Sequence, residues 1–127
     1  MALAPKNSLS EKFHGFYGSV PDVMAYAPGR IEVLGNHTDY NDGLVLSTAT
    51  DLYTYVAVKG TDGKNNATVH SFDMENTAEL DLDNSLKVKI PGQWSNYLKG
   101  VLVELSKLGK LKPFKSVSTF ACLVPNH

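Results

Sequence analysis

The sequence contains a single cysteine, Cys122, in 127 residues. One thiol cannot form a disulfide within the chain or supply the paired cysteines of a structural zinc site, so a reducing compartment is favoured. Neither sign of charge predominates, because the 12 Lys and Arg residues are nearly balanced by 13 Asp and Glu residues, and the net charge is -1. Without a Lys/Arg-rich run, the chain has little to attract a nucleic acid or an anionic membrane. A small-molecule partner is therefore expected.

Long hydrophobic runs are absent as well. No apolar stretch follows the lysine in residues 1–8, so we expect no signal peptide and no transmembrane span, and a cytoplasmic location is the simplest interpretation. The composition, 43% hydrophobic and 20% charged, is typical of a globular protein. The length allows at most one domain of ordinary size.

Several familiar enzyme motifs are missing. The sequence has no Gly-x-Gly-x-x-Gly, Walker A, Gly-x-Ser-x-Gly or His-Glu-x-x-His pattern. A partial calcium-loop pattern begins at Asp39, but its glycine comes one residue early and Thr50 stands where a bidentate glutamate is required. His37 and Asp39 could supply two metal ligands, yet the sequence places no third. We therefore predict no metal site.

Two segments have helical periodicity. Ser8 to Glu11 has the form of a capping box, and apolar residues follow at helical spacing until Gly18. A longer apolar stripe ends before Gly109 and predicts a helix whose apolar residues, apart from Trp94 at its open end, lie in the core. Its members are Trp94, Tyr97, Leu98, Val101, Leu102, Leu105 and Leu108.

The remaining apolar segments are rich in β-branched and aromatic residues and predict strands. They cover residues 23–27, 30–34, 44–50, 52–58, 67–72, 77–82 and 116–124. We expect the 67–72 strand to pair antiparallel with the 52–58 strand, and we interpret His70 as structural. The predicted fold class is α+β, an antiparallel-rich sheet with helices packed on one face.

A dense polar cluster lies between two of these strands. Residues 36–42 read Asn-His-Thr-Asp-Tyr-Asn-Asp, and burying so many polar groups without partners would cost about 1 to 3 kcal/mol each. They should face solvent or a polar ligand. The same residues also suit an ordinary turn, because Asn-Asp-Gly is a good turn sequence. Arg30, where the preceding strand begins, is either a solvated charge or a phosphate clamp.

Residues 28–43 read P-G-R-I-E-V-L-G-N-H-T-D-Y-N-D-G and closely resemble the galactokinase signature, P-G-R-V-N-L-I-G-E-H-T-D-Y-N-x-G. Leu44-Val-Leu46, the helix opening Trp94 to Gly100 and the last strand up to Pro125 are similar to galactokinases too. The resemblance runs collinearly over residues 20–127. It places the chain with the kinases of galactose, homoserine, mevalonate and phosphomevalonate, the GHMP kinases.

This resemblance implies a reaction and roles for particular residues. GHMP kinases transfer the γ-phosphoryl group of ATP to a small-molecule hydroxyl with Mg²⁺, here the C1 hydroxyl of galactose or a related sugar. Arg30 would stabilise charge during transfer. His37 and Asp39 would hydrogen-bond sugar hydroxyls, and Asn36 would contact the hydroxymethyl end. Trp94 resembles an aromatic residue near the adenine pocket, although a core role remains open.

Two departures from the signature qualify this expectation. Asn36 replaces the usual glutamate, which removes a negative charge but keeps a hydrogen-bonding amide and opens the site to an altered sugar. The glycine- and serine-rich phosphate loop that follows the proline matching Pro125 is missing, as is the second domain. Residues 1–127 thus resemble a partial N-terminal GHMP kinase domain, from which we expect no kinase activity alone.

Two further possibilities stay open at this point. A non-catalytic sugar-binding or regulatory protein on the same scaffold is the alternative function, and the arginine at position 30 favours the kinase. A partial domain also exposes edges and apolar faces, which would favour self-association.

Overall fold

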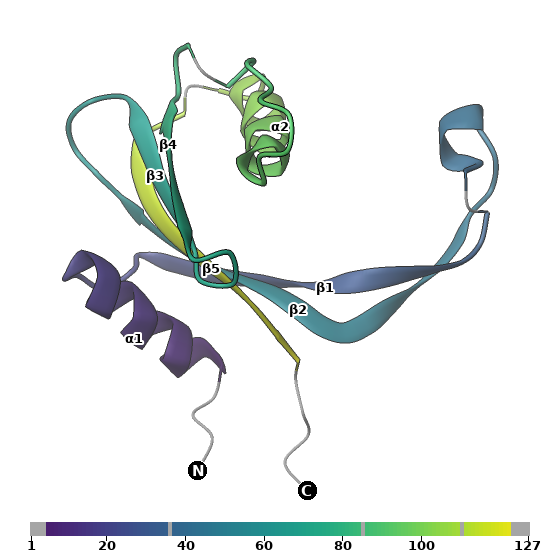
Figure 1. Cartoon of the computed structure of the whole chain (residues 1–127), viewed down its shortest axis with the longest axis horizontal. Coiled ribbons are helices and arrows are strands. Elements are labelled where there is room, and N and C mark those ends of the chain that lie inside the picture. The colour runs from purple at the N-terminus through teal and green to yellow at the C-terminus, as the bar shows by residue number, and fades with distance from the viewer. Residues whose placement is uncertain (1–4, 36, 85, 110, 123–127) are drawn as a thin grey trace, which may run out of the picture.

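The computed structural model describes residues 5–35, 37–84, 86–109 and 111–122. In this part of the chain, five strands and two α-helices form an α+β fold with one mostly antiparallel sheet, which confirms the predicted class (Figure 1). In chain order the elements are α1 (Pro5–Tyr17), β1 (Val23–Leu34), the 3-10 turn η1 (Asp39–Asn41), β2 (Leu46–Gly60), β3 (Asn66–Ser71), β4 (Asn76–Asp81), α2 (Ser95–Ser106) and β5 (Phe114–Cys122).

The strand order in the sheet is β1-β2-β5-β3-β4. Neighbours pair antiparallel except β3 and β5, which are parallel. The predicted pairing of the 67–72 strand with the 52–58 strand is wrong, because β5 lies between β3 and β2. The chain leaves β4, passes through α2 and returns along β5, as a crossover connection between parallel neighbours requires.

The first two strands are longer than the sequence indicated. Pro28 and Gly29 do not end β1, which continues to Leu34 with a register shift between Pro28 and Arg30. A proline is tolerated here because β1 is an edge strand and the ladder is irregular at this point. Gly29 allows a close approach here, since a Cβ at this position would lie 2.9 Å from the Thr50 Oγ1 atom.

The helices lie on opposite faces of the sheet, not on one face as predicted. Leu9 and Phe13 of α1 are buried against Tyr55 and Ala57 of β2. On the other face, Leu102 of α2 packs in a cluster with Val69 and Leu80 from β3 and β4. Ala57 is aligned with position 70 through position 117 of β5, so both residues lie on the same face of the sheet. Because side chains alternate along a strand, the neighbouring Val69 lies on the opposite face. Each face of the sheet thus has its own apolar core.

The predicted N-terminal helix begins earlier than its sequence signal. α1 starts at Pro5, so the capping-box pattern at Ser8 to Glu11 lies inside the helix and does not start it. Proline is favoured as a first helical residue, because its ring fixes a helical φ and the missing N–H has no partner there in any case.

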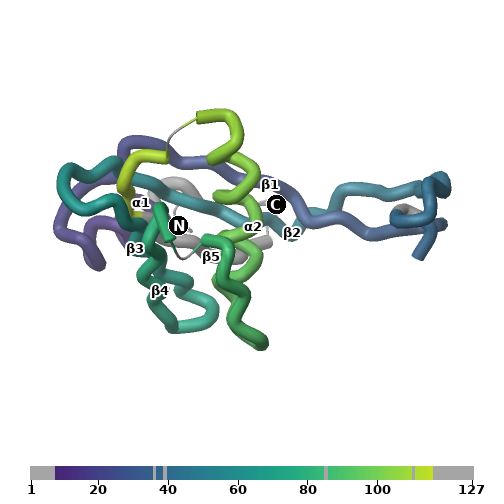
Figure 2. Tube along the Cα trace, turned by 90° about the horizontal axis from the view of Figure 1, so that it is seen from above, coloured from purple at the N-terminus to yellow at the C-terminus, as the bar shows by residue number. Residues whose placement is uncertain are grey.

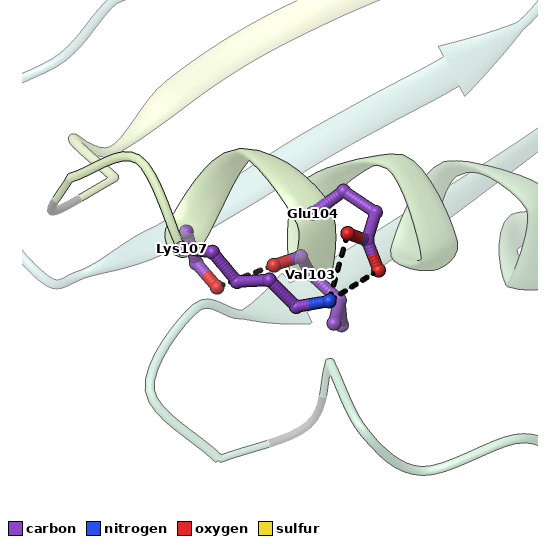
Figure 3. A network of polar contacts seen from close by, with 4 residues as sticks. Val103, Glu104 and Lys107 are labelled. Atoms are coloured by element: carbon purple, nitrogen blue, oxygen red, sulfur yellow. Dashed lines mark hydrogen bonds and ion pairs between the residues drawn. The ribbon is translucent and has the colours of Figure 1, made fainter.

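The helix predicted from the apolar stripe is confirmed. The prediction that the stripe lies in the core is confirmed only in part. Leu102 is buried, and Leu98 and Trp94 pack against the same cluster. The prediction is wrong for four members that are exposed: Tyr97, Val101, Leu105 and Leu108. The last turn is bound by polar contacts, with Lys107 Nζ 2.7 Å from each Glu104 carboxylate oxygen and Ser106 Oγ 2.7 Å from the Val103 carbonyl (Figure 3).

One part of the sheet projects away from the rest. Within the described residues, β5 pairs with residues 52–60 of β2, and β1 and β2 continue beyond this pairing as a two-stranded ribbon. We call residues 30–34 and 46–49, with the connecting residues 35 and 37–45, the arm, and the remaining elements the body. Figures 1 and 2 show the arm extending from the body in two perpendicular views. No helix within the described ranges is long and apolar enough to cross a membrane.

Candidate functional site

The polar cluster predicted from the sequence lies at the tip of the arm. Its described residues are largely exposed, with Tyr40 at 70% exposure, which agrees with the expectation that the cluster faces solvent or a polar ligand. The tip is a short 3-10 turn, Asp39–Asn41, between the ends of two paired strands. The arm therefore presents a polar loop to the outside.

Thr38 holds this loop together. Its Oγ1 donates to the Gly35 carbonyl at 2.6 Å, and its own carbonyl accepts from the backbone N–H groups of Asn41 at 3.0 Å and Gly43 at 2.8 Å. A Cβ at position 43 would lie 2.6 Å from the Thr38 Cβ atom, so only glycine fits beside it. These contacts close the loop without help from the body.

His37 has an uncommon backbone conformation. Its φ is 65°, in the left-handed region that few residues other than glycine adopt. The Asn41 Nδ2 atom lies 3.4 Å from the His37 carbonyl, and the His37 ring meets the Tyr40 ring at 6.2 Å between centroids. Such conformations cluster at ligand-binding sites, so the geometry is consistent with a functional histidine.

Asn36 lies outside the described residues. Asp39 begins the 3-10 turn, so its backbone is placed next to Thr38 and two residues from His37. Their proposed contacts therefore remain predictions from the signature.

Arg30 lies on the arm, on the same face as Glu32. Arg30 pairs with Ala49 and Glu32 with Ser47, and residues two apart on a strand point to the same side. The arginine is exposed. Glu32 is half-buried, and its Oε1 atom is shielded from solvent with no hydrogen-bond donor among the described residues. An arginine and a carboxylate thus share the polar face of the arm.

Trp94 belongs to a different part of the molecule. It immediately precedes α2, half-buried against the body, and its indole N–H donates to Asn76 Oδ1 at 3.2 Å. Figure 1 shows α2 over the body and the polar loop at the far end of the arm. The structure therefore places Arg30, His37 and Asp39 on the arm, and it does not bring Trp94 to them.

Trp94 also lines two adjoining cavities of about 830 and 610 Å³. Lys99 lies between them, only 6% exposed, and its Nζ atom donates to the Val88 carbonyl at 3.0 Å. Asn96 fixes the same segment through hydrogen bonds to both the N–H and the carbonyl of Ile90. The cavity walls are thus held by specific contacts.

Metal ligation finds little support in the described residues. They include no group of three or more His, Cys, Asp or Glu side chains that could hold an ion. The pair His37 and Asp39 gains no third ligand from this part of the chain.

Sequence reasoning missed three features of the arm: the Thr38 hydrogen bonds, the close approach at Gly43 and the shielded carboxylate of Glu32. The first two depend on how the loop folds back on itself, which the residue types alone do not specify. Glu32 could have been found, because the galactokinase signature has asparagine at this position.

Comparison with known proteins agrees with the site's location. Residues 11–60 match the family model described as the galactokinase galactose-binding signature. Galactokinase from Staphylococcus carnosus (strain TM300) is 39% identical over 103 residues, which are 80% of this chain and 26% of that protein. The chain thus spans about a quarter of the length of this relative.

Solved structures share the fold. The crystal structure of Lactococcus lactis galactokinase complexed with galactose aligns with 97% of this chain and 32% of that one, at 29% identity and a TM-score of 0.74. Methanococcus jannaschii mevalonate kinase, at 16% identity, aligns with 83% of this chain and 33% of that one with a TM-score of 0.51, which supports the fold alone. The chain therefore corresponds to the N-terminal region of galactokinases in the GHMP kinase family, over about 26% of the full length.

Proposed function

We propose that this chain is the sugar-binding N-terminal part of a galactokinase-like kinase, which transfers the γ-phosphoryl group of ATP to the C1 hydroxyl of galactose or a close relative. The observation that carries the proposal is the galactose-binding signature over residues 11–60, a range that includes the whole arm and its polar loop. Residues 1–127 would form a partial N-terminal domain, in a cytoplasmic enzyme.

Different residues of the arm would bind the sugar and stabilise the transferred phosphoryl group. Asp39 would accept hydrogen bonds from two adjacent sugar hydroxyls, and His37 would bind toward the far end of the ring. Arg30, on the strand that leads into the loop, would offset negative charge that develops as the phosphoryl group is transferred. Asn36 would contact the hydroxymethyl end through its amide.

The adenine part of the nucleotide would bind beside α2, and its phosphates would extend toward the sugar loop and Arg30. A cavity of about 830 Å³ lies within the usual size range of small-molecule sites, and the half-buried Trp94 in its wall offers a flat surface for stacking. ATP and Mg²⁺ supply the transferred group and its charge neutralisation in the whole enzyme. The described residues include no group of three or more His, Cys, Asp or Glu side chains, and we assign this chain no step at the metal.

Activity and binding can be measured separately. The isolated chain should give no turnover in an ATP-coupled assay with galactose. A chimera in which the chain replaces the matching quarter of Staphylococcus carnosus galactokinase should phosphorylate galactose. Turnover by the isolated chain would contradict the proposal. Galactose binding without turnover in a folded chimera would favour the non-catalytic sugar-binding protein instead.

Asp39→Asn should weaken galactose binding of this chimera by about tenfold or more, because a hydrogen bond to a charged group contributes roughly 1.5 to 3 kcal/mol. Isothermal titration measures this. Asp62→Asn, in the exposed turn before β3, is the control and should leave affinity unchanged. Equal affinities for both variants would remove Asp39 from the sugar site.

The replacement of the usual glutamate by Asn36 is best examined with a panel of sugars. Preference of the chimera for galactose would mean that the amide substitutes for the carboxylate. Phosphorylation of a 6-substituted sugar alone would exclude galactose as the substrate.

A further inference from the structure

Two positions of the galactokinase signature carry each other's residue type in this chain. The signature has an asparagine where this chain has Glu32, and a glutamate where this chain has Asn36. The chain therefore keeps one carboxylate and one carboxamide at these two positions, but in the reverse order. Either replacement alone would change the charge of the arm, and together they leave it as it is in the signature. The pair indicates one carboxylate that has changed its place along the arm.

The structure places this carboxylate beside Arg30. The strand register is regular from Arg30, which pairs with Ala49, to Glu32, which pairs with Ser47. The two side chains therefore leave the same side of β1, with their backbones roughly 7 Å apart along the strand. The cross-strand neighbours Ala49 and Ser47 are small and exposed, so no large side chain of β2 stands directly opposite either charge.

The Glu32 carboxylate has acceptor capacity to offer. The residue is half-buried, and its Oε1 atom is shielded from solvent with no donor among the described residues. A shielded oxygen without a hydrogen bond is costly, so a donor brought by a ligand would stabilise this carboxylate more than a fully hydrated one. Rotation about the last side-chain bond exchanges the two oxygens, and either can face such a donor.

Arg30 does not use up this capacity. No ion pair within the described ranges involves Glu32 or Arg30. A carboxylate that served only to hold the arginine would lie within ion-pair distance of it. Both charges thus remain available to a ligand on the polar face of the arm.

We propose that Glu32 is a sugar-specificity residue, which accepts a hydrogen bond from the hydroxymethyl hydroxyl of galactose in place of the signature glutamate. The inference rests on the proposed function for the identity of the sugar. The neutral amide of Asn36 suffices because Glu32 supplies the charged acceptor, and a second carboxylate serving the same hydroxyl would repel the first. A site built to bind a hydroxyl rejects an analogue that lacks it, since its polar group is then left unpaired.

The test uses the chimera with Staphylococcus carnosus galactokinase, with kcat/KM measured for galactose and for 6-deoxygalactose, which lacks this hydroxyl. Glu32→Asn should lower kcat/KM for galactose by about tenfold or more, mainly through KM, because a hydrogen bond to a charged group is lost. The value for 6-deoxygalactose should stay within about twofold. Glu32→Gln, which keeps the shape of the side chain, should act in the same direction. Glu11→Gln, at an exposed position of α1, is the matched control and should change neither value.

A double variant tests the exchange itself. Glu32→Asn combined with Asn36→Glu restores the order of the signature and should return kcat/KM for galactose to within about threefold of the unsubstituted chimera. Asn36→Glu alone should not raise this value, because the acceptor is already present. A rise of about tenfold in that single variant would mean that the acceptor is missing in the native chain and would overturn the proposal.

Several other results would also overturn it: equal treatment of the two sugars by the unsubstituted chimera, equal losses on both sugars in Glu32→Asn, or no recovery in the double variant. If turnover of 6-deoxygalactose is too slow to measure, isothermal titration gives its affinity instead. Thermal midpoints from circular dichroism establish that the variants are folded, and a Glu32→Gln chimera that does not fold would show a structural role and count against the proposal.

The inference and the proposed function fail in different ways. Turnover of galactose that Glu32→Asn leaves unchanged would contradict the specificity role alone. A folded chimera without turnover of either sugar would contradict the proposed function, and the role of Glu32 with it.

Discussion

The body and the arm contain equally apolar residues in opposite surroundings. Phe13 and Leu9 are at most 1% exposed between α1 and the sheet, whereas Ile31 and Leu34 on the arm are more than half exposed. The body is stabilised by burial of side chains on both faces of the sheet. The arm is held by its backbone ladder and by the Thr38 loop contacts. The sugar-site residues are on the arm, so the residues proposed to bind galactose belong to the less supported region.

The largest effect should come from removing a core side chain of the body. Phe13→Ala should destabilise the chain by about 3 to 5 kcal/mol, because it deletes a fully buried ring and leaves a cavity. Ile31→Ala on the arm should change stability by no more than about 0.5 kcal/mol. Urea denaturation followed by circular dichroism compares them. Similar losses for both would mean that the arm is packed in the free chain.

A substitution at Gly35 should act on the arm alone. Its φ is 97°, and a Cβ there would lie 2.6 Å from the Leu44 carbonyl oxygen, so Gly35→Ala should cost roughly 1 to 3 kcal/mol of local strain. Amide exchange in residues 37–45 should speed up while the thermal midpoint of the body stays the same. Gly15→Ala, in α1 with open space around it, should instead stabilise the body by about 0.5 to 1 kcal/mol. A lowered midpoint for Gly35→Ala would show that body and arm unfold together.

Tyr17 should make the stability of the body fall as the pH rises in the alkaline range. Burial, with a smaller contribution from Glu79, raises the pKa of Tyr17 from 10.0 to about 12, and its hydroxyl donates to the Thr68 carbonyl at 3.2 Å. A raised folded-state pKa gives stability that is complete below pH 10 and declines as the pH approaches 12. Urea midpoints at pH 9 and pH 11 should differ less for Tyr17→Phe than for the native chain. An equal difference would remove Tyr17 as the cause.

The smallest effect should appear in acid. The Gly60 backbone N–H, at 2.9 Å, and then the Lys59 side chain, at 3.2 Å, lower the pKa of Asp22 below its usual 3.8. A lowered folded-state pKa gives stability that is present above pH 4 and lost as the pH falls below it. Asp22→Asn should therefore reduce the loss of stability between pH 5 and pH 3, by a small amount because the pair is exposed. An unchanged acid profile would show that this contact does not contribute.

The sequence predicted what depends on local pattern. The apolar stripe located α2, and the alternation at residues 77–82 located β4, because both signals come from neighbouring residues. The predictions of the strand that pairs with β3 and of the sheet face that each helix covers were wrong, since both depend on β5 lying between β2 and β3. The stripe also shows which side of α2 is apolar without showing that Tyr97 or Leu108 has anything to pack against.

In the site, too, the features that depend on local sequence were predicted and those that depend on the folded structure were not. The signature located the polar loop at residues 36–42, and the structure shows most of its described residues exposed at the tip of the arm. The hydrogen bonds of Thr38, the left-handed backbone of His37 and the shielded Glu32 carboxylate depend on the folded ribbon. Residue types alone carry no information about these distances.

The most direct test of the account is a galactose titration of the chimera with Staphylococcus carnosus galactokinase, followed by amide exchange of residues 37–45. Galactose should slow exchange there in a saturable manner, glucose should do so much less, and Asp39→Asn should raise the galactose concentration at the midpoint by about tenfold or more. Unchanged exchange at saturating galactose in a folded chimera would contradict the assignment of the arm as the sugar site.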